Sequence, residues 1–173
     1  LFSLPTVFSL GEFIGRIGYR LFPGMRNIVL RNLRTAYRED KTKEELSQLT
    51  CEIFERFGAN MLTSFRIPFL SDEQILSHIT FVNSELVTDP ARTEGIIWVV
   101  PHMGNWDHAG AWCSQHISSV NTVAEKLEPE QLYTAFVDFR TSLGMHIHGL
   151  GDPGVYQQLR GTLQSGGLVA LLA

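Results

Sequence analysis

The first part of the chain carries apolar side chains at the three- and four-residue spacing of amphipathic helices. This spacing predicts three helices, over about 8–21, 25–37 and 42–67. Pro23 separates the first two helices, Thr42 and Glu45 form a capping-box pattern at the start of the third, and Pro68 ends it. A fourth, short helix is expected after Ser71.

From about residue 79 the pattern changes to short apolar runs that alternate with amphipathic segments. We expect strands over 79–82, 95–100, 120–124, 145–150 and 168–173, and helices over 106–116, 129–144 and 153–164. Alternating strands and helices are typical of a parallel sheet with right-handed crossovers. The predicted fold class is therefore α/β, with a helical N-terminal portion followed by a mostly parallel βαβ sheet that has helices on both faces.

No linker or internal repeat divides the sequence, so we interpret residues 1–173 as a single domain. The apolar run 168–173 is predicted to be a buried strand, and no turn or charged residue follows it. We therefore expect the domain to be incomplete at its C-terminus, with the missing part supplied further along the polypeptide or by a second polypeptide. The sequence leaves the oligomeric state open.

Composition excludes several classes of protein. With 44% hydrophobic and 18% charged residues, the chain is too apolar to be disordered. Its two cysteines, Cys51 and Cys113, form no CxxC pair, which excludes a disulfide scaffold, a zinc ribbon and a cysteine-ligated iron–sulfur cluster. The net charge of −4 argues against a nucleic acid as partner.

The charge is distributed unevenly along the chain. Residues 1–43 hold eight basic and three acidic side chains, a net charge of +5, whereas the rest of the chain is strongly acidic. The apolar stretch 1–11 is about half as long as the roughly 20 residues that a bilayer-spanning helix needs. We therefore interpret 1–43 as a basic amphipathic segment that faces an anionic membrane surface and lies on it without crossing it.

The best candidate for catalytic residues is the segment Pro-His-Met-Gly-Asn-Trp-Asp, residues 101–107. It follows a predicted buried strand, and ligands of open α/β sheets bind at the carboxyl ends of strands, where His102 falls. Gly104 permits a tight turn, Asn105 is a candidate N-cap, and Asp107 falls in the first turn of the next helix. The Asp107 carboxylate could then hold one imidazole nitrogen of His102 while the other takes a proton from a substrate hydroxyl. A purely structural His–Asp pair is the alternative.

Four stretches together carry a likeness to a known family. They are the H-x4-D motif with its flanks in VVPHMGNWDHAGAW, and the segments 26–33, 123–133 and 139–144. The sequence resembles the lysophospholipid-type acyltransferases of the lipid A lauroyl/myristoyl acyltransferase group. Within that group it is most similar to the actinobacterial phosphatidylinositol mannoside acyltransferases.

The resemblance implies an enzyme, an acyltransferase that needs no cofactor or metal. It would move a fatty acyl group from a thioester donor, acyl-CoA or acyl carrier protein, to a hydroxyl of a glycolipid acceptor such as a mannose of phosphatidylinositol mannoside. It would do so peripherally, at the cytoplasmic face of a bacterial cell membrane. His102 would be the general base and Asp107 its orienting partner. The family also has an acidic-Arg element directly after the strand that corresponds to 168–173, beyond the last residue of this sequence.

The resemblance also implies substrate-binding residues. Arg140 matches a family arginine that could bind a donor phosphate or the acceptor head group. Glu125 and Lys126 match a second block, and Asn105 and Trp106 belong to the motif itself. Each has a structural alternative: Arg140 could cap its helix, Glu125 and Lys126 could be surface charges, and Trp106 could be a packing residue.

Two other functions compete with the acyltransferase. His146 and His148 would share one face of a strand, a spacing seen in zinc sites, with His108 and His116 nearby in sequence, so a metal-dependent hydrolase is the second possibility. Alternation alone does not make these side chains converge, so we expect them not to bind a metal. A non-catalytic lipid-binding module is the third possibility.

Overall fold

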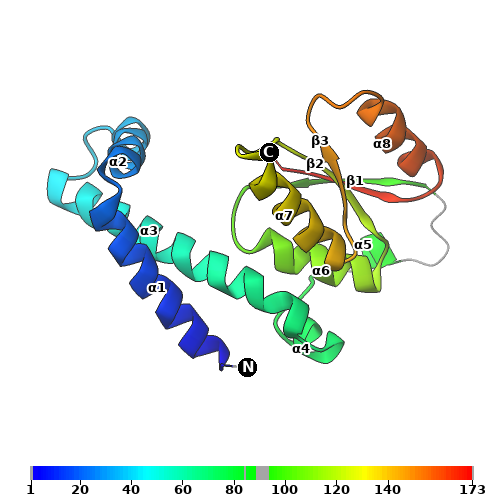
Figure 1. The fold of residues 1–173 in the computed structure, drawn as a ribbon, viewed down its shortest axis with the longest axis horizontal. Coiled ribbons are helices and arrows are strands. Elements are labelled where there is room, and N and C mark those ends of the chain that lie inside the picture. The colour runs from blue at the N-terminus through cyan, green and yellow to red at the C-terminus, as the bar shows by residue number, and fades with distance from the viewer. Residues whose placement is uncertain (1, 84, 89–93, 173) are drawn as a thin grey trace. The chain divides into compact units, whose positions relative to one another are not determined.

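The computed structural model describes residues 2–83, 85–88 and 94–172. The chain divides into two compact units, Leu1–Arg66 and Ile67–Ala173. The first unit is helical and the second contains the sheet, as Figure 1 shows by its colours.

The first unit consists of the three helices that the sequence predicts, α1 (Leu4–Leu21), α2 (Pro23–Tyr37) and α3 (Lys43–Arg66). Pro23 occupies the first position of α2, where a missing N–H has no cost. The capping box before α3 is formed: the Glu45 N–H donates to Thr42 Oγ1 at 3.2 Å, and the Thr42 N–H donates to the Glu45 carboxylate at 2.7 Å. The Thr42 N–H and hydroxyl both donate to the Glu45 carboxylate, and these two hydrogen bonds hold the pKa of Glu45 below its usual value.

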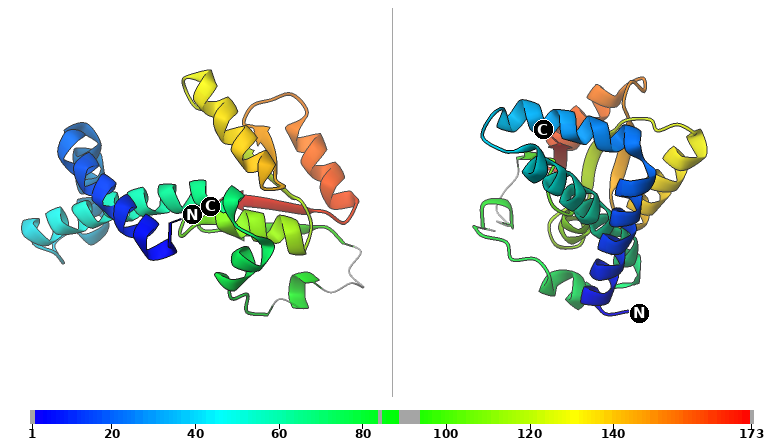
Figure 2. Two further views of the ribbon diagram at one scale, coloured as in Figure 1. Left: turned by 60° about the horizontal axis from the view of Figure 1, so that its bottom comes forward. Right: turned by 90° about the vertical axis from the view of Figure 1, so that its left-hand side faces the viewer.

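Helices α1 and α3 lie side by side with their backbones in contact (Figure 2). A Cβ atom added to Gly15 of α1 would lie 2.0 Å from the Phe54 carbonyl oxygen of α3. One added to Gly11 would lie 2.4 Å from Ala59 Cα, and one added to Gly58 of α3 would lie 2.3 Å from the Gly11 carbonyl oxygen. Only glycine fits at these positions, so this small-residue seam fixes how closely the two helices pack.

Replacing Gly15 by alanine should therefore destabilise the first unit. The added methyl group forces the helix backbones apart, and overpacking of this kind costs about 1–3 kcal/mol. The matched control is Gly18→Ala on the same helix, where the nearest atom to the new Cβ is a Phe54 ring carbon at 3.6 Å, an ordinary contact. The control should be neutral or slightly stabilising because alanine favours the helix. Urea denaturation of both variants measures the difference in their free energies of unfolding. Equal stability of the two variants would contradict the inference that only glycine fits at position 15.

The second unit follows the predicted alternation of strands and helices. Its elements are η1 (Ile67–Phe69), α4 (Asp72–Ser77), α5 (Glu85–Thr88), β1 (Ile96–Val100), α6 (Trp106–His116), β2 (Val120–Ala124), α7 (Glu130–Ser142), β3 (His146–Gly149), α8 (Val155–Gln164) and β4 (Leu168–Leu172). The bounds of α6 and β2 are those expected from the sequence. The short helix α5 was not expected.

The strand predicted over 79–82 was wrong, because the structure has a loop and a turn there. Ile79 and Phe81 are half-buried and pack against the core of the second unit, while Val82 is 75% exposed. The alternation of apolar and exposed positions therefore comes from a loop laid against the core and not from pairing in a sheet.

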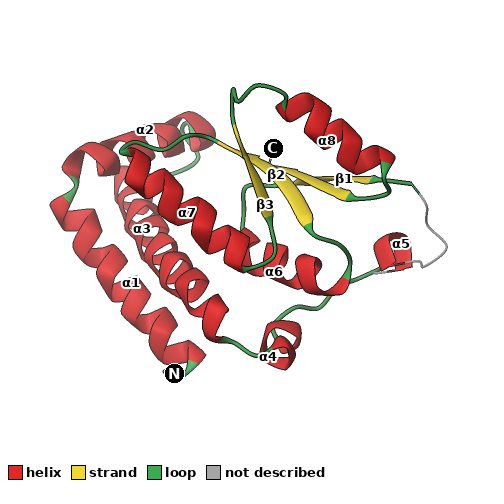
Figure 3. Cartoon of the chain, turned by 45° about the vertical axis from the view of Figure 1, so that its right-hand side comes forward, coloured by secondary structure: helices red, strands yellow, loops and turns green. Residues whose placement is uncertain are grey.

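The four strands form one parallel sheet in the order β1-β4-β2-β3. Strand β4 pairs with both neighbours, so Leu168 lies opposite Ile96 on one side and Val120 on the other. Helices α6 and α8 cover opposite faces of the sheet (Figures 1 and 3). The predicted fold class, an α/β fold with a parallel sheet between helices, is confirmed.

The core of the second unit lies between α6 and the sheet. Ala111, Trp112 and Cys113 of α6 pack with Leu168 of β4 and with Met145, the residue before β3. The Trp112 ring stacks on Phe81, with centroids 5.1 Å apart and planes 14° from parallel. Phe139 of α7 packs against this cluster from the same side, so α6 and α7 share one face of the sheet.

Candidate functional site

The turn between β1 and α6 is built as its sequence predicts. Gly104 has a φ of +69°, a left-handed conformation that favours glycine. Asn105 is the N-cap of α6, since its side-chain oxygen accepts a hydrogen bond from the His108 N–H at 2.9 Å. His102 lies just beyond the end of β1, and Asp107 lies in the first turn of α6, where the helix dipole favours its negative charge.

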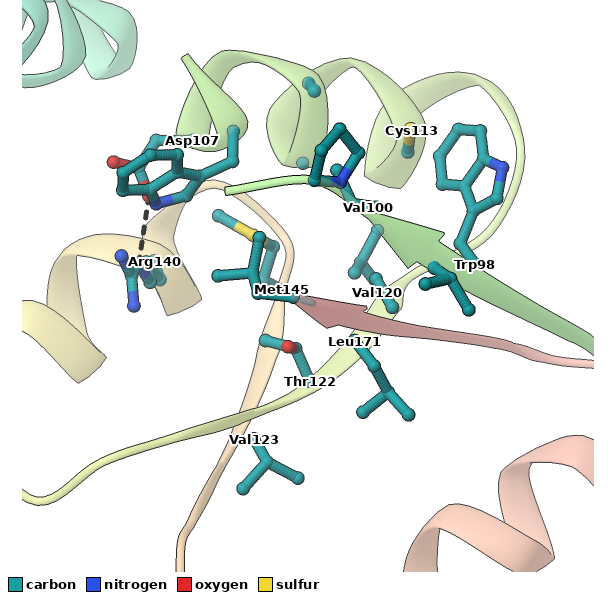
Figure 4. Close-up of a pocket in the computed structure, with 17 residues that line it drawn as sticks. Trp98, Val100, Asp107, Cys113, Val120, Thr122, Val123, Arg140, Met145 and Leu171 are labelled. Carbon is teal, nitrogen blue, oxygen red and sulfur yellow. Dashed lines mark hydrogen bonds and ion pairs between the residues drawn. The ribbon is translucent and has the colours of Figure 1, made fainter. Parts of the chain in front are cut away.

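Asp107 is buried and forms an ion pair with Arg140 of α7. The Arg140 Nε–H donates to Asp107 Oδ1 at 2.9 Å, as the dashed line in Figure 4 shows. The Asp107 side chain is 2% exposed and that of Arg140 is 20% exposed. The guanidinium also lies 5.8 Å from the centre of the Phe136 ring. A carboxylate this deeply buried needs a charged partner, so the pair fixes α7 to the first turn of α6.

His102 is exposed, and its ring meets Trp106 edge-on, with centroids 4.6 Å apart and an angle of 78° between the planes. The hydrogen bonds between described residues do not include one that joins His102 to Asp107. The role of Asp107 as the orienting partner of His102 stays a prediction. The Trp106 indole N–H is buried and has no hydrogen-bond acceptor among the described residues.

Two further predicted site residues, Glu125 and Lys126, directly follow the carboxyl end of β2. Lys126 forms an ion pair with Asp152, a residue of the loop after β3 that sequence reasoning did not single out. The hydrogen bond to this carboxylate and its negative charge raise the pKa of Lys126. Glu125 is exposed. Both ends of the Lys126–Asp152 pair lie near Gly149, where an added Cβ would meet them at less than 3 Å.

An apolar cavity of about 270 Å³ lies beside the Asp107–Arg140 pair (Figure 4). Its lining comes from β1, β2, β4, α6 and the start of β3, and includes Trp106 and Pro101, the neighbour of His102. Some lining residues are exposed, such as Val99 at 67%, whereas Cys113 and Met145 are buried. The cavity therefore extends from exposed side chains at the carboxyl end of β1 to buried side chains in the core of the second unit, while His102 itself is not among its lining residues.

Cys113 contributes an uncharged wall to this cavity. It is 1% exposed, and burial raises its pKa to about 12. A thiol that stays protonated is a poor nucleophile, so Cys113 acts here as a small apolar residue.

A comparison with known protein families identifies the chain. The model of the bacterial lipid A biosynthesis acyltransferases matches residues 2–173. The chain belongs to the bacterial lipid A biosynthesis acyltransferase family.

Two curated proteins resemble this member of the acyltransferase family. The phosphatidylinositol mannoside acyltransferase of Mycobacterium tuberculosis (strain ATCC 25618 / H37Rv) is 34% identical over 130 residues, which are 72% of this chain and 41% of the relative. The phosphatidylinositol mannoside acyltransferase of Mycolicibacterium smegmatis (strain ATCC 700084 / mc(2)155) is 36% identical over 87 residues, 49% of this chain and 28% of the relative. The chain thus spans less than half the length of the curated relatives that it matches.

Within the described residues of this acyltransferase-family chain, no group of three or more His, Cys, Asp and Glu side chains could hold a metal ion. His148 Nε2 lies 3.3 Å from the Asn121 side-chain oxygen, and His108 Nε2 lies 3.1 Å from the Ile75 carbonyl oxygen. His116 Nδ1 lies 2.8 Å from the Trp112 carbonyl oxygen. The alternative of a metal-dependent hydrolase has no support in these contacts.

Among the helices of the described residues, none is both long enough and apolar enough to span a bilayer.

Proposed function

We propose that the protein to which this chain belongs moves a fatty acyl group from a thioester donor to a hydroxyl of a mannosylated glycolipid. The observation that carries the proposal is the apolar cavity at the carboxyl end of β1, whose lining includes Pro101, the residue before His102, and Trp106, whose ring contacts that of His102. Family membership and the names of the two mycobacterial relatives support this substrate class.

In this mechanism His102 is the general base. Its exposed imidazole takes the proton of the acceptor hydroxyl, and the hydroxyl oxygen attacks the carbonyl carbon of the thioester. A carbon–oxygen bond forms, the carbon–sulfur bond breaks, and the thiol leaves with a proton. The chain itself need not become acylated, and the neutral, buried Cys113 is unsuited to a covalent step.

Asp107 is the positioning residue in this proposal. Its carboxylate anchors the first turn of α6 to Arg140, and this turn directly follows the loop that carries His102. A shift in that turn would move the imidazole away from the acceptor hydroxyl, and small misplacements of this kind lower rates strongly.

The acyl chain would occupy the apolar cavity. Each methylene group transferred from water to an apolar environment contributes about 0.8 kcal/mol, so a cavity with apolar walls favours a fatty chain. Trp106 lines this cavity, contacts the His102 ring edge-on, and has a buried N–H without an acceptor among the described residues. A carbonyl oxygen of the bound donor would supply that acceptor and fix the thioester next to the base.

The polar parts of the substrates would bind at the charged residues around the cavity. Arg140 keeps part of its side chain exposed, and its guanidinium can contact a donor phosphate or the acceptor head group. Lys126 is about half exposed despite its pairing with Asp152, and Glu125 beside it can accept hydrogen bonds from sugar hydroxyls. Acyl-CoA is the donor that we favour, with acyl carrier protein as the alternative. Both donors are formed inside the cell, so we propose that the site works at the cytoplasmic face of the membrane.

The direct test is an assay with radiolabelled palmitoyl-CoA and mannosylated phosphatidylinositol. The full-length protein should transfer the label to the glycolipid. Transfer to water alone, or no turnover at all with either thioester donor, would contradict the proposal.

We further propose that the first unit binds an anionic membrane surface. Helix α1 presents a row of exposed apolar side chains that continues into α2: Leu10, Phe13, Ile14, Ile17, Leu21, Phe22, Met25 and Ile28. Exposed arginines, among them Arg31 and Arg34 of α2, lie on the same helices. Apolar and basic side chains together are the features that hold an amphipathic helix in a membrane interface.

Reversing two of these charges should release the protein from vesicles. Each basic residue near an anionic surface contributes about 1 kcal/mol, so Arg31→Glu/Arg34→Glu should weaken binding to vesicles with phosphatidylglycerol by at least about tenfold. The matched control is Arg160→Glu on α8 of the second unit, which is also exposed. Vesicle co-sedimentation measures the effect. Unchanged binding of the double variant, or an equal loss of binding in the control, would show that the membrane is not bound by these arginines of the first unit.

A further inference from the structure

The inner wall of the apolar cavity contains one long, flexible side chain. Met145 lines the cavity, is 4% exposed, and lies directly before β3. In Figure 4 it lies between Arg140 and Val120. The buried neighbours on this wall, Cys113 and Val120, have short side chains whose positions follow from the backbones of α6 and β2. Met145 is therefore the residue of this buried wall that can change the depth of the cavity without a shift of backbone.

The position of Met145 depends on a glycine of α6. A Cβ atom added to Gly110 would lie 2.4 Å from Met145 Sδ and 3.2 Å from its terminal methyl carbon. The missing side chain at Gly110 thus provides the space in which the end of Met145 rests. A methionine side chain has three rotatable bonds and can move when this space is filled.

We propose that Met145, held against Gly110, determines which length of acyl chain the enzyme transfers. The thioester end of the donor lies next to His102 and the chain extends toward the buried wall, so Met145 limits how many methylene groups fit. This inference rests on the proposed acyl transfer and adds to it a residue that sets donor specificity. A single methylene group that gains or loses its place in an apolar pocket changes specificity by about 10- to 200-fold.

Two substitutions should shift the preference in opposite directions. Gly110→Ala fills the space behind Met145 and pushes its thioether into the cavity, so the preference should move to shorter chains. Met145→Ala removes the side chain and deepens the cavity, so the preference should move to longer chains. In the double variant Gly110→Ala/Met145→Ala no thioether is left to be displaced, and the preference for long chains should return.

The experiment measures kcat/KM of the full-length protein for lauroyl-, myristoyl-, palmitoyl- and stearoyl-CoA, with mannosylated phosphatidylinositol as acceptor. The ratio of the value for palmitoyl-CoA to that for lauroyl-CoA should fall at least about tenfold in Gly110→Ala and rise in Met145→Ala. The matched control is Gly161→Ala, a glycine of α8 with no atom within 4 Å of an added Cβ, which should leave the ratio unchanged.

Thermal melting of each variant shows that it is folded. Removing the buried Met145 side chain leaves a cavity and lowers stability, so Met145→Leu, which keeps most of the volume, is measured beside it. Gly110→Ala adds a residue that favours the helix and tests the proposal even if Met145→Ala does not fold. An unchanged ratio in folded Gly110→Ala overturns the assignment of Met145. Absence of transfer from every donor in the unsubstituted protein contradicts the proposed function instead.

Discussion

Replacing His102 by alanine in the full-length protein should lower the rate of acyl transfer by about 10²- to 10⁴-fold, the usual contribution of a general base. The His102 ring is exposed and touches Trp106 edge-on, so its loss leaves the core of the second unit intact. The thermal melting temperature should therefore stay close to that of the unsubstituted protein. Transfer of label from palmitoyl-CoA measures the effect on the reaction.

A matched control for this variant is His146→Ala, which removes an exposed histidine from β3. It should keep the unsubstituted rate. If His102→Ala also kept that rate, His102 would not be the base. If the unsubstituted protein bound the glycolipid but transferred nothing, the alternative of a lipid-binding module would be favoured.

Replacing Arg140 by methionine should lower the free energy of unfolding by about 3–5 kcal/mol. The substitution leaves the Asp107 carboxylate, only 2% exposed, without the cation that neutralises it. Arg140→Lys keeps the charge but loses the planar guanidinium, so its effect on stability should be smaller. Urea denaturation measures both variants, and an unchanged stability of Arg140→Met would contradict the importance of the ion pair.

The double variant Asp107→Asn/Arg140→Met separates packing from catalysis. Removing both charges should restore part of the stability that Arg140→Met loses, since no unpaired carboxylate remains. Transfer activity should stay low in the double variant, because the carboxylate that anchors the turn next to His102 is gone. Unsubstituted activity in a folded Asp107→Asn variant would contradict the positioning role of Asp107.

Local features of the molecule could be predicted from the sequence because their causes lie within a few residues. Asn105 caps α6 by accepting a hydrogen bond from the N–H of His108, three positions later. Gly104 adopts a left-handed backbone conformation because it lacks a side chain. The capping box of Thr42 and Glu45 is formed by the same kind of local contact. The order of helices and parallel strands from β1 to β4 followed from the repeated change of apolar period.

The strand expected over 79–82 shows where this reasoning fails. Alternating apolar positions indicate which side chains are buried, but they do not indicate which elements of the fold cover those side chains. Ile79 and Phe81 pack against the core of their unit, and the centroid of the Phe81 ring lies 5.6 Å from that of Trp98 in β1, but neither residue pairs with a strand among the described residues. The small-residue seam of α1 and α3 was missed for the same reason, since nothing near Gly15 in the sequence indicates the backbone of Phe54.

By itself, the sequence determined most of the helices and the four strands of the sheet, the family likeness and the motif that contains His102 and Asp107. Only the tertiary structure decided that Arg140, 33 residues along the chain, pairs with Asp107, and that Met145 meets Gly110. It also decided the strand order β1-β4-β2-β3, in which the last strand lies between the first two. The physical reason is that turns and caps follow from contacts between near neighbours in the chain. Ion pairs, cavities and strand order depend on how distant segments pack, and many packings satisfy the same local pattern.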